Sequence, residues 1–265
     1  MNHLLRDKAP LTDESWREID EEAKRTLEHF LAGRKLLDLS NPKGWSHPGE
    51  PTGRVDDAGT LQDGTIARTR ITQPMIELRT PFALSRSELE AVDRGACDVD
   101  LDAVVSAAKS AALAEDEMIF HGAAGCAGLT GATPHDPIEI SSDYEHYPRF
   151  VAQGMARLQD AGVGGPYAIA LGPRCYTGVI EESEMGGYPV LEHLRLILGG
   201  PVARAQAVNG AVVVSLRGGD FELVCGQDLS IGYLDHDADD VRLYIEESIA
   251  LRICSPEAAI HLAYP

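Results

Sequence analysis

Cysteine is scarce in this chain and follows no recognisable pattern. There are five cysteines, an odd number, and no two of them form a C-x-x-C pair. Disulfide frameworks and zinc sites need paired or closely spaced cysteines, so neither is expected. The pattern indicates reduced thiols that act as small apolar side chains, as in cytoplasmic proteins. The five positions are Cys97, Cys126, Cys175, Cys225 and Cys254.

Long apolar runs are absent as well. A helix that spans a bilayer needs ~18 or more apolar residues. The longest uncharged stretch, residues 118–135, is interrupted by four glycines and a proline. The first ten residues include Arg6, Asp7 and Lys8 and contain no apolar core of signal-peptide length. We therefore expect a cytoplasmic protein without a membrane-spanning segment.

Basic residues are few in comparison with acidic ones. The 265 residues include 23 Lys and Arg against 42 Asp and Glu, which gives a net charge of −19. A surface this negative repels the phosphate backbone of nucleic acids and anionic lipid surfaces. The sequence contains no basic cluster that would offset the repulsion, so neither nucleic acid nor a membrane is expected as a partner.

Several segments show the periodicity of helices. Thr12 or Ser15 can cap a first amphipathic helix, and residues 15–18 fit the capping-box pattern. A second capping box at residues 85–88 opens a short helix, and residues 101–120 predict a longer, alanine-rich one. Helices and strands then follow one another without a regular βαβ repeat, which predicts an α+β fold.

Two segments are unusual for a compact domain. Residues 46–64 are polar and rich in glycine and acidic side chains, which is typical of an arm, a lid or disorder. Residues 241–253 alternate between apolar and polar positions, with Glu247 as the main exception. As one strand they would span ~43 Å, about twice the usual length. Such a strand favours an elongated subunit over a compact enzyme.

Two residue pairs could carry chemistry, but each has a simpler interpretation. Ser106 and Lys109 match S-x-x-K, one helical turn apart, yet the companion S-D-N and K-T-G elements are absent. Glu117 and His121 lie four residues apart on a helix and could share a metal ion. Solvated helix faces explain both pairs better. The residues themselves therefore predict no catalytic residue, cofactor or metal site.

Short motifs stand in a fixed order over nearly the whole chain. The longest are Arg-Gly-Gly-Asp-Phe-Glu-Leu at residues 217–223 and Gly-Gln-Asp-Leu-Ser-Ile-Gly-Tyr at residues 226–233. In this order and content the chain resembles the encapsulin shell proteins, the linocin-like family built on the tailed-phage major-capsid fold. The other matching segments are residues 9–12, 16–23, 32–38, 81–95, 115–122, 165–167 and 187–189.

The resemblance implies a phage major-capsid-like fold with three parts. Residues 1–45, 76–132 and 221–265 would form a peripheral domain that includes the N-terminal helix and the long strand. Residues 46–75 would form an extended arm that reaches over a neighbouring subunit. Residues 133–220 would form an axial domain, which meets its copies at the symmetry axes of a closed shell.

The resemblance also implies a function without catalysis. Encapsulin shells are icosahedral compartments, here of sixty copies or a multiple, that enclose cargo enzymes such as peroxidases or ferritin-like iron oxidases. The cargo is held by a C-terminal targeting peptide on the inner wall. Phe30 and Ile231 could equally be core residues. The positions that match the peptide-binding residues are Phe30, Arg34, Leu36, Asp38, Leu229 and Ile231.

The turn at residues 181–188 matches the pore loop at the five-fold axis of the family. Its three glutamates would favour cations such as iron, although an ordinary solvated loop would look the same. The matching residues are Glu181, Glu182, Glu184, Met185, Gly186, Gly187 and Tyr188. Some family members are thought to stack a flavin on a tryptophan, but this chain has Ser87 there, so no flavin is expected.

Two other functions stay open at this point. A capsid protein of an integrated phage would share the fold and would hold nucleic acid, which the acidity argues against. A hydrolase that uses Ser106 and Lys109 would form a small oligomer.

Overall fold

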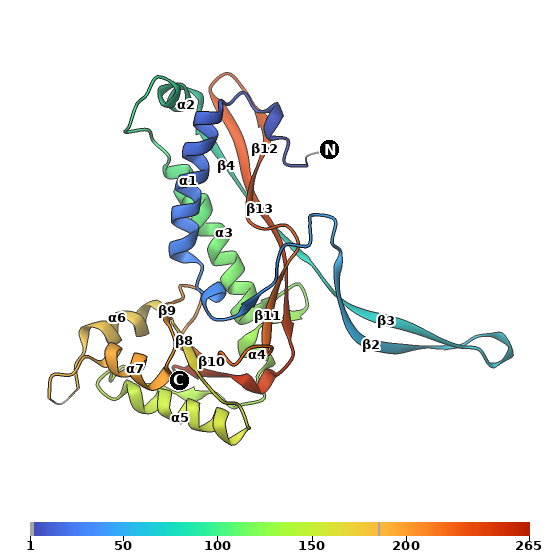
Figure 1. The fold of residues 1–265 in the computed structure, drawn as a ribbon, viewed down its shortest axis with the longest axis vertical. Coiled ribbons are helices and arrows are strands. Elements are labelled where there is room, and N and C mark those ends of the chain that lie inside the picture. Colours follow the sequence, from blue (N-terminus) through green and yellow to red (C-terminus); the bar gives the residue numbers. More distant parts are fainter. Residues whose placement is uncertain (1–2, 185) are drawn as a thin grey trace.

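The computed structural model describes residues 3–184 and 186–265. The subunit is elongated, with two sheets placed along its long axis and a hairpin that projects from its side (Figure 1). Helices and strands are mixed along the chain, which confirms the predicted α+β class. No helix in the described part of the chain has both the length and the apolar character needed to cross a membrane.

One long strand is the spine of the first sheet. β13 (Asp240–Ile253) confirms the strand predicted at residues 241–253. One edge of β13 pairs antiparallel with β4 (Ile76–Ser85). The other edge is shared by β12 (Ser230–His236) and β11 (Phe221–Cys225), and β1 (Asp38–Leu39) adds to β11. The turn between β11 and β12 therefore lies beside the middle of the spine.

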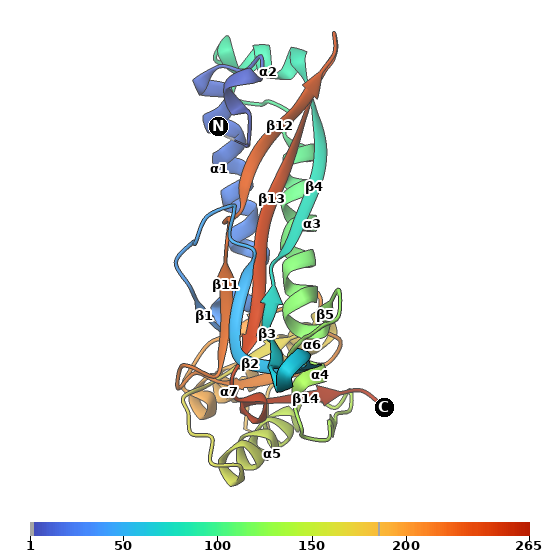
Figure 2. The same ribbon diagram turned by 90° about the vertical axis from the view of Figure 1, so that its right-hand side faces the viewer.

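Two helices cover one face of this sheet (Figures 1 and 2). They are α1 (Asp13–Phe30) and α3 (Asp102–His121), while the short α2 (Arg86–Asp93) lies at the end of the sheet. The apolar stripe of α1 and the alanine-rich face of α3 pack on the odd-numbered side chains of β13, such as the fully buried Leu243. This packing explains the period of two in the strand, because one face of it meets helices.

The N-terminus of α1 differs from the predicted capping box. Thr12, the other predicted candidate, caps the helix: its Oγ1 accepts the Ser15 backbone N–H at 3.1 Å. Ser15 lies inside the helix, and its hydroxyl donates to Leu89 O at 3.3 Å and to Asp93 Oδ1 at 3.1 Å. Ser85 does precede α2, but its side chain makes no capping hydrogen bond. The Ser15 hydroxyl fastens α1 to α2 and is unavailable as a cap.

The polar segment predicted at residues 46–64 belongs to a long antiparallel hairpin. β2 (Gly49–Thr60) pairs with β3 (Ile66–Pro74), and most residues in both strands are exposed. We call this hairpin the arm (Figure 1). A two-stranded hairpin alone is marginally stable in water. The arm therefore depends on its base and on surfaces outside its own subunit.

The base of the arm is anchored by buried polar contacts. Glu50 is 5 % exposed and accepts hydrogen bonds from Lys43 and from His47, the latter at 2.8 Å. The hydrogen bond from the Lys43 ammonium group holds the pKa of the Glu50 carboxyl below its usual value. On the other strand Gln73 donates to the Leu251 carbonyl oxygen of the spine. Both strands of the arm thus leave the body from fixed positions.

The second sheet has the order β7–β14–β10–β8–β9. These strands are β7 (Ile138–Glu139), β14 (Ala259–Ala263), β10 (Ala211–Ser215), β8 (Tyr167–Leu171) and β9 (Val202–Arg204). Two of its inner strands, β8 and β10, are buried along their whole length. The remaining elements are α4 (Leu129–Ala132), α5 (Tyr147–Asp160), α6 (Pro173–Glu181), α7 (Val190–Leu198), the hairpin of β5 (Gly122–Ala123) and β6 (Cys126–Ala127), and the short 3-10 helices η1 (Arg6–Lys8), η2 (Gly33–Lys35), η3 (Gln62–Gly64) and η4 (Pro256–Ala258).

The C-terminal strand returns to the second sheet. β14 pairs with β10 and β7, although the predicted peripheral domain extends to residue 265. Leu223 and Leu251 of the first sheet share one hydrophobic core with Ile169 and Val213 of the second. The two halves are therefore fused through a common core, and the division into peripheral and axial domains stays a prediction.

Candidate functional site

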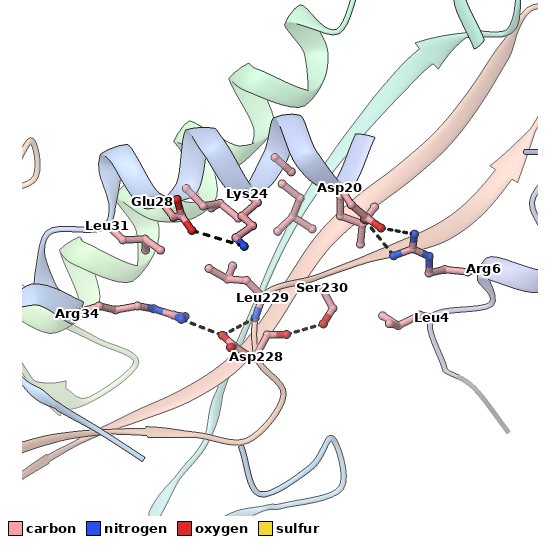
Figure 3. A pocket seen from close by; sticks show the side chains of 14 residues that line it. Leu4, Arg6, Asp20, Lys24, Glu28, Leu31, Arg34, Asp228, Leu229 and Ser230 are labelled. Atoms are coloured by element: carbon pink, nitrogen blue, oxygen red, sulfur yellow. Dashed lines mark hydrogen bonds and ion pairs between the residues drawn. The ribbon is translucent and has the colours of Figure 1, made fainter. Parts of the chain in front are cut away.

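A groove of about 500 Å³ runs between α1 and the start of β12 (Figure 3). Helix α1 forms one wall, the segment that leads into β12 forms the other, and the N-terminal segment lies at one end. We call it the α1–β12 groove. Its lining residues are Leu4, Arg6, Asp20, Ala23, Lys24, Leu27, Glu28, Leu31, Arg34, Asp228, Leu229, Ser230, Ile231 and Ile245.

Three of the six residues predicted to bind a cargo peptide line this groove. They are Arg34, Leu229 and Ile231. Leu229 is half-buried, whereas Ile231 is 5 % exposed and belongs to the hydrophobic cluster beneath α1 and α3. Ile231 therefore serves the core and the groove wall together, and Leu229 is the more accessible apolar side chain.

The other three predicted residues lie outside the groove. Phe30 is half-buried and lines a separate groove beside β9. Leu36 is 2 % exposed and belongs to the main hydrophobic core. Asp38 is exposed on β1, where its Oδ2 accepts the Gly219 backbone N–H at 2.6 Å. The structure thus brings together half of the predicted set, and the peptide-binding role itself stays a prediction.

Helix α1 and the residue that caps its C-terminus, Leu31, supply groove residues outside the predicted peptide-binding set. Leu27 and Leu31 are spaced four residues apart and present apolar side chains to the groove. Lys24 and Glu28, also four apart, form an ion pair of 3.9 Å at its rim. The amphipathic period of the helix could have pointed to these residues, because they lie at the border between its apolar and charged faces.

The N-terminal segment closes one end of the groove. The Leu4 carbonyl oxygen accepts the Tyr233 backbone N–H at 2.8 Å. Arg6 binds both carboxylate oxygens of Asp20, at 3.1 and 2.7 Å, and its guanidinium lies 3.9 Å from the ring centre of Trp16. No short-range sequence signal links Leu4 to β12, so this wall could not be predicted from local pattern.

The free edge of β12 faces the groove. Backbone groups of an antiparallel strand alternate between its two edges. Because Tyr233 donates its N–H to Leu4 and not to β13, Ile231, two residues earlier, directs its backbone N–H and C=O to the same free edge. An extended peptide in the groove can therefore form main-chain hydrogen bonds with β12.

A buried ion cluster lies beneath the groove. Arg34 donates to Glu115 at 2.7 to 3.0 Å, to Glu247 at 3.1 Å and to Asp228 at 2.9 Å. The Glu115 and Glu247 side chains are almost completely buried. Burial lowers the pKa of Arg34, but the hydrogen bonds and negative charges of its three carboxylate partners outweigh burial and raise that pKa above the usual value. Arg34 therefore stays charged and is held rigidly.

Glu247, the exception in the period of the long strand, is explained by this cluster. Its odd-numbered position faces the helices, where an apolar side chain would be expected. Burial, together with the negative charge of Glu115, raises the pKa of Glu247 well above its usual range. Its Oε1 lacks an ordinary partner among the described residues. A neutral Glu247 resolves both observations, since its protonated oxygen can donate to Glu115.

A second buried carboxyl fixes the turn at the end of α1. Asp116 Oδ1 accepts the Gly33 N–H at 2.8 Å, and both its oxygens accept the Ala32 N–H at 3.2 Å. A side chain at Gly33 would collide with Ile119, whose Cδ1 lies 2.4 Å from the Cβ position. Burial raises the pKa of Asp116 to about 7, against the lowering effect of these N–H groups. Asp116 therefore titrates near neutral pH.

We expect Asp116→Asn to remove one component of the pH dependence of stability. The folded protein keeps the Asp116 proton up to a pKa of about 7, whereas an unfolded chain loses it near 3.9. The wild-type free energy of unfolding should therefore fall by about 4 kcal/mol, relative to the variant, between about pH 4 and pH 7. Urea denaturation across this range measures the difference. If the free energies of unfolding of the two proteins followed parallel curves over this pH range, Asp116 would have to be ionised throughout it.

The predicted pore loop connects α6 to α7. Glu181 ends α6, Glu182 follows, and both are exposed. Glu184 Oε1 accepts a hydrogen bond from His193 Nδ1 at 2.7 Å, so this glutamate is held against α7. A bridge between residues 183 and 189 closes the loop. Gly186 and Gly187 turn the chain with φ of +109° and +82°.

Tyr188 and Met185 are the remaining residues of the predicted pore loop. Tyr188 is 49 % exposed, and its carbonyl oxygen accepts the Glu184 backbone N–H at 2.9 Å. Met185 lies outside the described residues. The loop therefore presents Glu181, Glu182 and Tyr188 at its surface, and its place at a pore stays a prediction.

The alternative catalytic and metal pairs gain no support from their surroundings. Ser106 and Lys109 are exposed, and Lys109 Nζ lies 5.3 Å from the ring centre of Phe30. His121 Nε2 contacts the Ala207 carbonyl oxygen at 2.8 Å, and its Nδ1 contacts a threonine hydroxyl at 3.3 Å. Both ring nitrogens of His121 are thus engaged in contacts other than with Glu117.

The long spine, the projecting arm and the second sheet together form a fold of the phage-capsid class. The virus-like particle from Pyrococcus furiosus has the same fold with a TM-score of 0.66 at 18% identity, covering 93% of this chain and 98% of that one. The capsid of Myoviridae phage XM1 gives a TM-score of 0.56 at 12% identity, covering 88% and 90%. Both likenesses concern the fold, and they confirm the predicted capsid-like architecture.

Sequence comparison gives the family. The model for "Encapsulating protein for peroxidase" matches residues 1–250. The chain is 45% identical to the type 1 encapsulin shell protein of Rhodospirillum rubrum, over 99% of this chain and 96% of that protein. The chain therefore belongs to the encapsulin shell-protein family and is a structural subunit, not an enzyme. The hydrolase alternative is wrong.

Proposed function

We propose that copies of this chain assemble into an icosahedral compartment that encloses a cargo enzyme by binding its C-terminal peptide in the α1–β12 groove. Sixty copies, or a multiple, are the number that icosahedral symmetry allows. The description of the matching family model supports a peroxidase as cargo, and a ferritin-like iron oxidase is the other candidate. The observation that carries the proposal is the groove itself, a partly apolar channel with an open strand edge.

The groove has the features that an extended peptide needs. Leu27, Leu31 and Leu229 offer apolar contacts, and the Ile231 backbone offers main-chain hydrogen bonds. Arg34 fixes Asp228 at the floor, where a polar group of the peptide can be recognised. Because the buried cluster holds Arg34 in place before binding, little side-chain freedom is lost when the peptide binds.

The predicted division of the chain assigns a task to each part. The peripheral domain carries the groove, the arm at residues 46–75 contacts a neighbouring subunit, and the axial domain meets its copies at the symmetry axes. The free thiols of all five cysteines fit a reducing compartment, such as the bacterial cytoplasm. The net charge of −19 disfavours nucleic acid as the content of the shell.

Electron microscopy of the protein purified with a co-expressed peroxidase tests this proposal. We expect closed particles in the megadalton range that retain the enzyme and lose it when its C-terminal peptide is deleted. A monomer or small oligomer would contradict the assembly. Particles that retain nucleic acid instead of the enzyme would favour the phage-capsid alternative.

The exposed glutamates of the α6–α7 loop support a cation pore. Glu181 and Glu182 carry no ion pair within the described part of the chain, so their charge is available to attract cations. Copies of the loop around an axis would add their fields in a narrow opening. Glu184 contributes less, because it is occupied by His193.

Neutralising the two free glutamates should slow the entry of metal ions. We expect Glu181→Gln/Glu182→Gln to reduce the rate at which Co²⁺ quenches an enclosed fluorescent protein about tenfold at low salt. Glu192→Gln is the matched control, because Glu192 lies on α7 and is paired with Arg195 at 2.6 Å. Equal rates in the double variant and the wild type would exclude a role of the loop in ion entry.

A further inference from the structure

A second groove lies on the other side of the last turn of α1. It has a volume of about 340 Å³ and is bounded by the end of α1, by β9 and by α6, which converge in Figure 1. Phe30 and Tyr176, both half-buried, supply its apolar surface. We call it the β9 groove.

The charge of the β9 groove is opposite to that of the protein. His29, Lys35 and Arg204 line it, and no Asp or Glu is among its described lining residues. The α1–β12 groove and three further grooves of the described surface all contain carboxylates. The three basic side chains form no ion pair or hydrogen bond with another described residue. In a chain of net charge −19, this is a local group of basic side chains with no carboxylate among the described lining residues of its groove.

The β9 groove also has an open strand edge. β9 is the terminal strand of its sheet and pairs in parallel with β8 only. The Pro201 carbonyl oxygen and the Ala205 N–H both bond to β8, at 3.1 and 2.8 Å. By alternation along the strand, Val202 and Arg204 direct their backbone N–H and C=O away from the sheet. An extended chain can add there as a further strand.

We propose that the β9 groove binds an acidic segment of a protein partner in extended conformation. The backbone of the segment pairs with Val202 and Arg204, and its carboxylates meet Lys35, Arg204 and His29. Charge complementarity selects acidic residues, because each would form a charge-assisted bond with a cation that is otherwise unpaired. The apolar surface of Phe30 accepts a neighbouring aliphatic side chain of the segment.

The enclosed cargo is the source of this segment, and that assignment rests on the proposed function. His29 and Phe30 lie in the last turn of α1, directly between Glu28 and the C-cap Leu31, which line the α1–β12 groove. A protein whose end is bound in one groove therefore brings its nearby segments past the other. Two weak contacts on one partner strengthen each other through effective concentration.

Co-expression of the full-length shell protein with tailed fluorescent proteins tests the proposal. The first tail alternates Glu and Val and the second alternates Gln and Val. The third alternates Glu and Pro, which keeps the charge but favours a polyproline II helix over a strand. We expect the Glu–Val tail to be retained per subunit at least about tenfold more than the other two. Lys35→Glu/Arg204→Glu should reduce its retention by the same factor.

The outcomes separate this site from the α1–β12 groove. Leu229→Glu, which changes only the α1–β12 groove, should leave retention of the Glu–Val tail unchanged even if no cargo peptide binds there. Equal retention of all three tails, or no effect of Lys35→Glu/Arg204→Glu, would overturn the proposal. Failure of Lys35→Glu/Arg204→Glu to form particles would also overturn it, because a second copy of the chain would then occupy the groove.

Discussion

Removing most of the arm is expected to abolish the particle. In this variant an Asn-Gly turn replaces residues 52–71 and joins the strands at Pro51 and Thr72, which face each other in the hairpin. The wild-type arm exposes Val55, Leu61 and Ile66, each more than half accessible, and its own subunit covers none of them. These side chains need the surface of another subunit, and without them the contact between copies is lost. Sedimentation velocity should show species far below the megadalton range.

The variant should still fold, because the anchor of the arm is untouched. Glu50 keeps its contacts with Lys43 and His47, and Gln73 keeps the Leu251 carbonyl. Far-UV circular dichroism and a cooperative thermal transition verify this. As a matched control, Asp56→Asn/Asp57→Asn changes the charge of the arm and leaves its apolar side chains in place, so assembly should persist. Intact particles of the truncated variant would show that the arm is dispensable.

The length of the spine could be read from the sequence, but the environment of Glu247 could not. A period of two is a local property, and it predicted β13 within one residue at its start. Glu247 can be buried because Arg34, more than two hundred positions away in the sequence, donates a hydrogen bond to it. The same holds for β14, because no local pattern in residues 259–263 indicates which of the two sheets this strand joins. Long-range pairing decided these features.

The candidate groove was predictable only in part for the same reason. Family resemblance pointed to Arg34, Leu229 and Ile231, and the structure brings these three together. Leu36 shows the limit, because an apolar residue next to a binding site and an apolar residue beneath it look alike in sequence. The closing contact of Leu4 with Tyr233 involves backbone atoms, which carry no side-chain signature.

Leu229→Glu is expected to abolish cargo loading while the particle still assembles. Leu229 is half-buried and faces the α1–β12 groove, so a glutamate removes an apolar contact and places a charge beside a bound peptide. Truncating a central contact of a peptide site costs about 2 kcal/mol or more, which corresponds to about 30-fold weaker binding. Ile231→Asp is a poorer test, because Ile231 is 5 % exposed and its loss would disturb the core.

The matched control is Leu234→Glu on β12, the strand that follows Leu229. Leu234 is 44 % exposed and does not line the groove, so the change adds the same charge without touching the site. Particles of both variants, purified with a co-expressed peroxidase, are compared by the ratio of enzyme to shell protein. Loss of enzyme from Leu229→Glu alone places the targeting peptide between α1 and β12. Equal loading in both variants would show that the peptide binds to another surface. Equal loss in both would show that the added negative charge, and not its position in the groove, prevents loading.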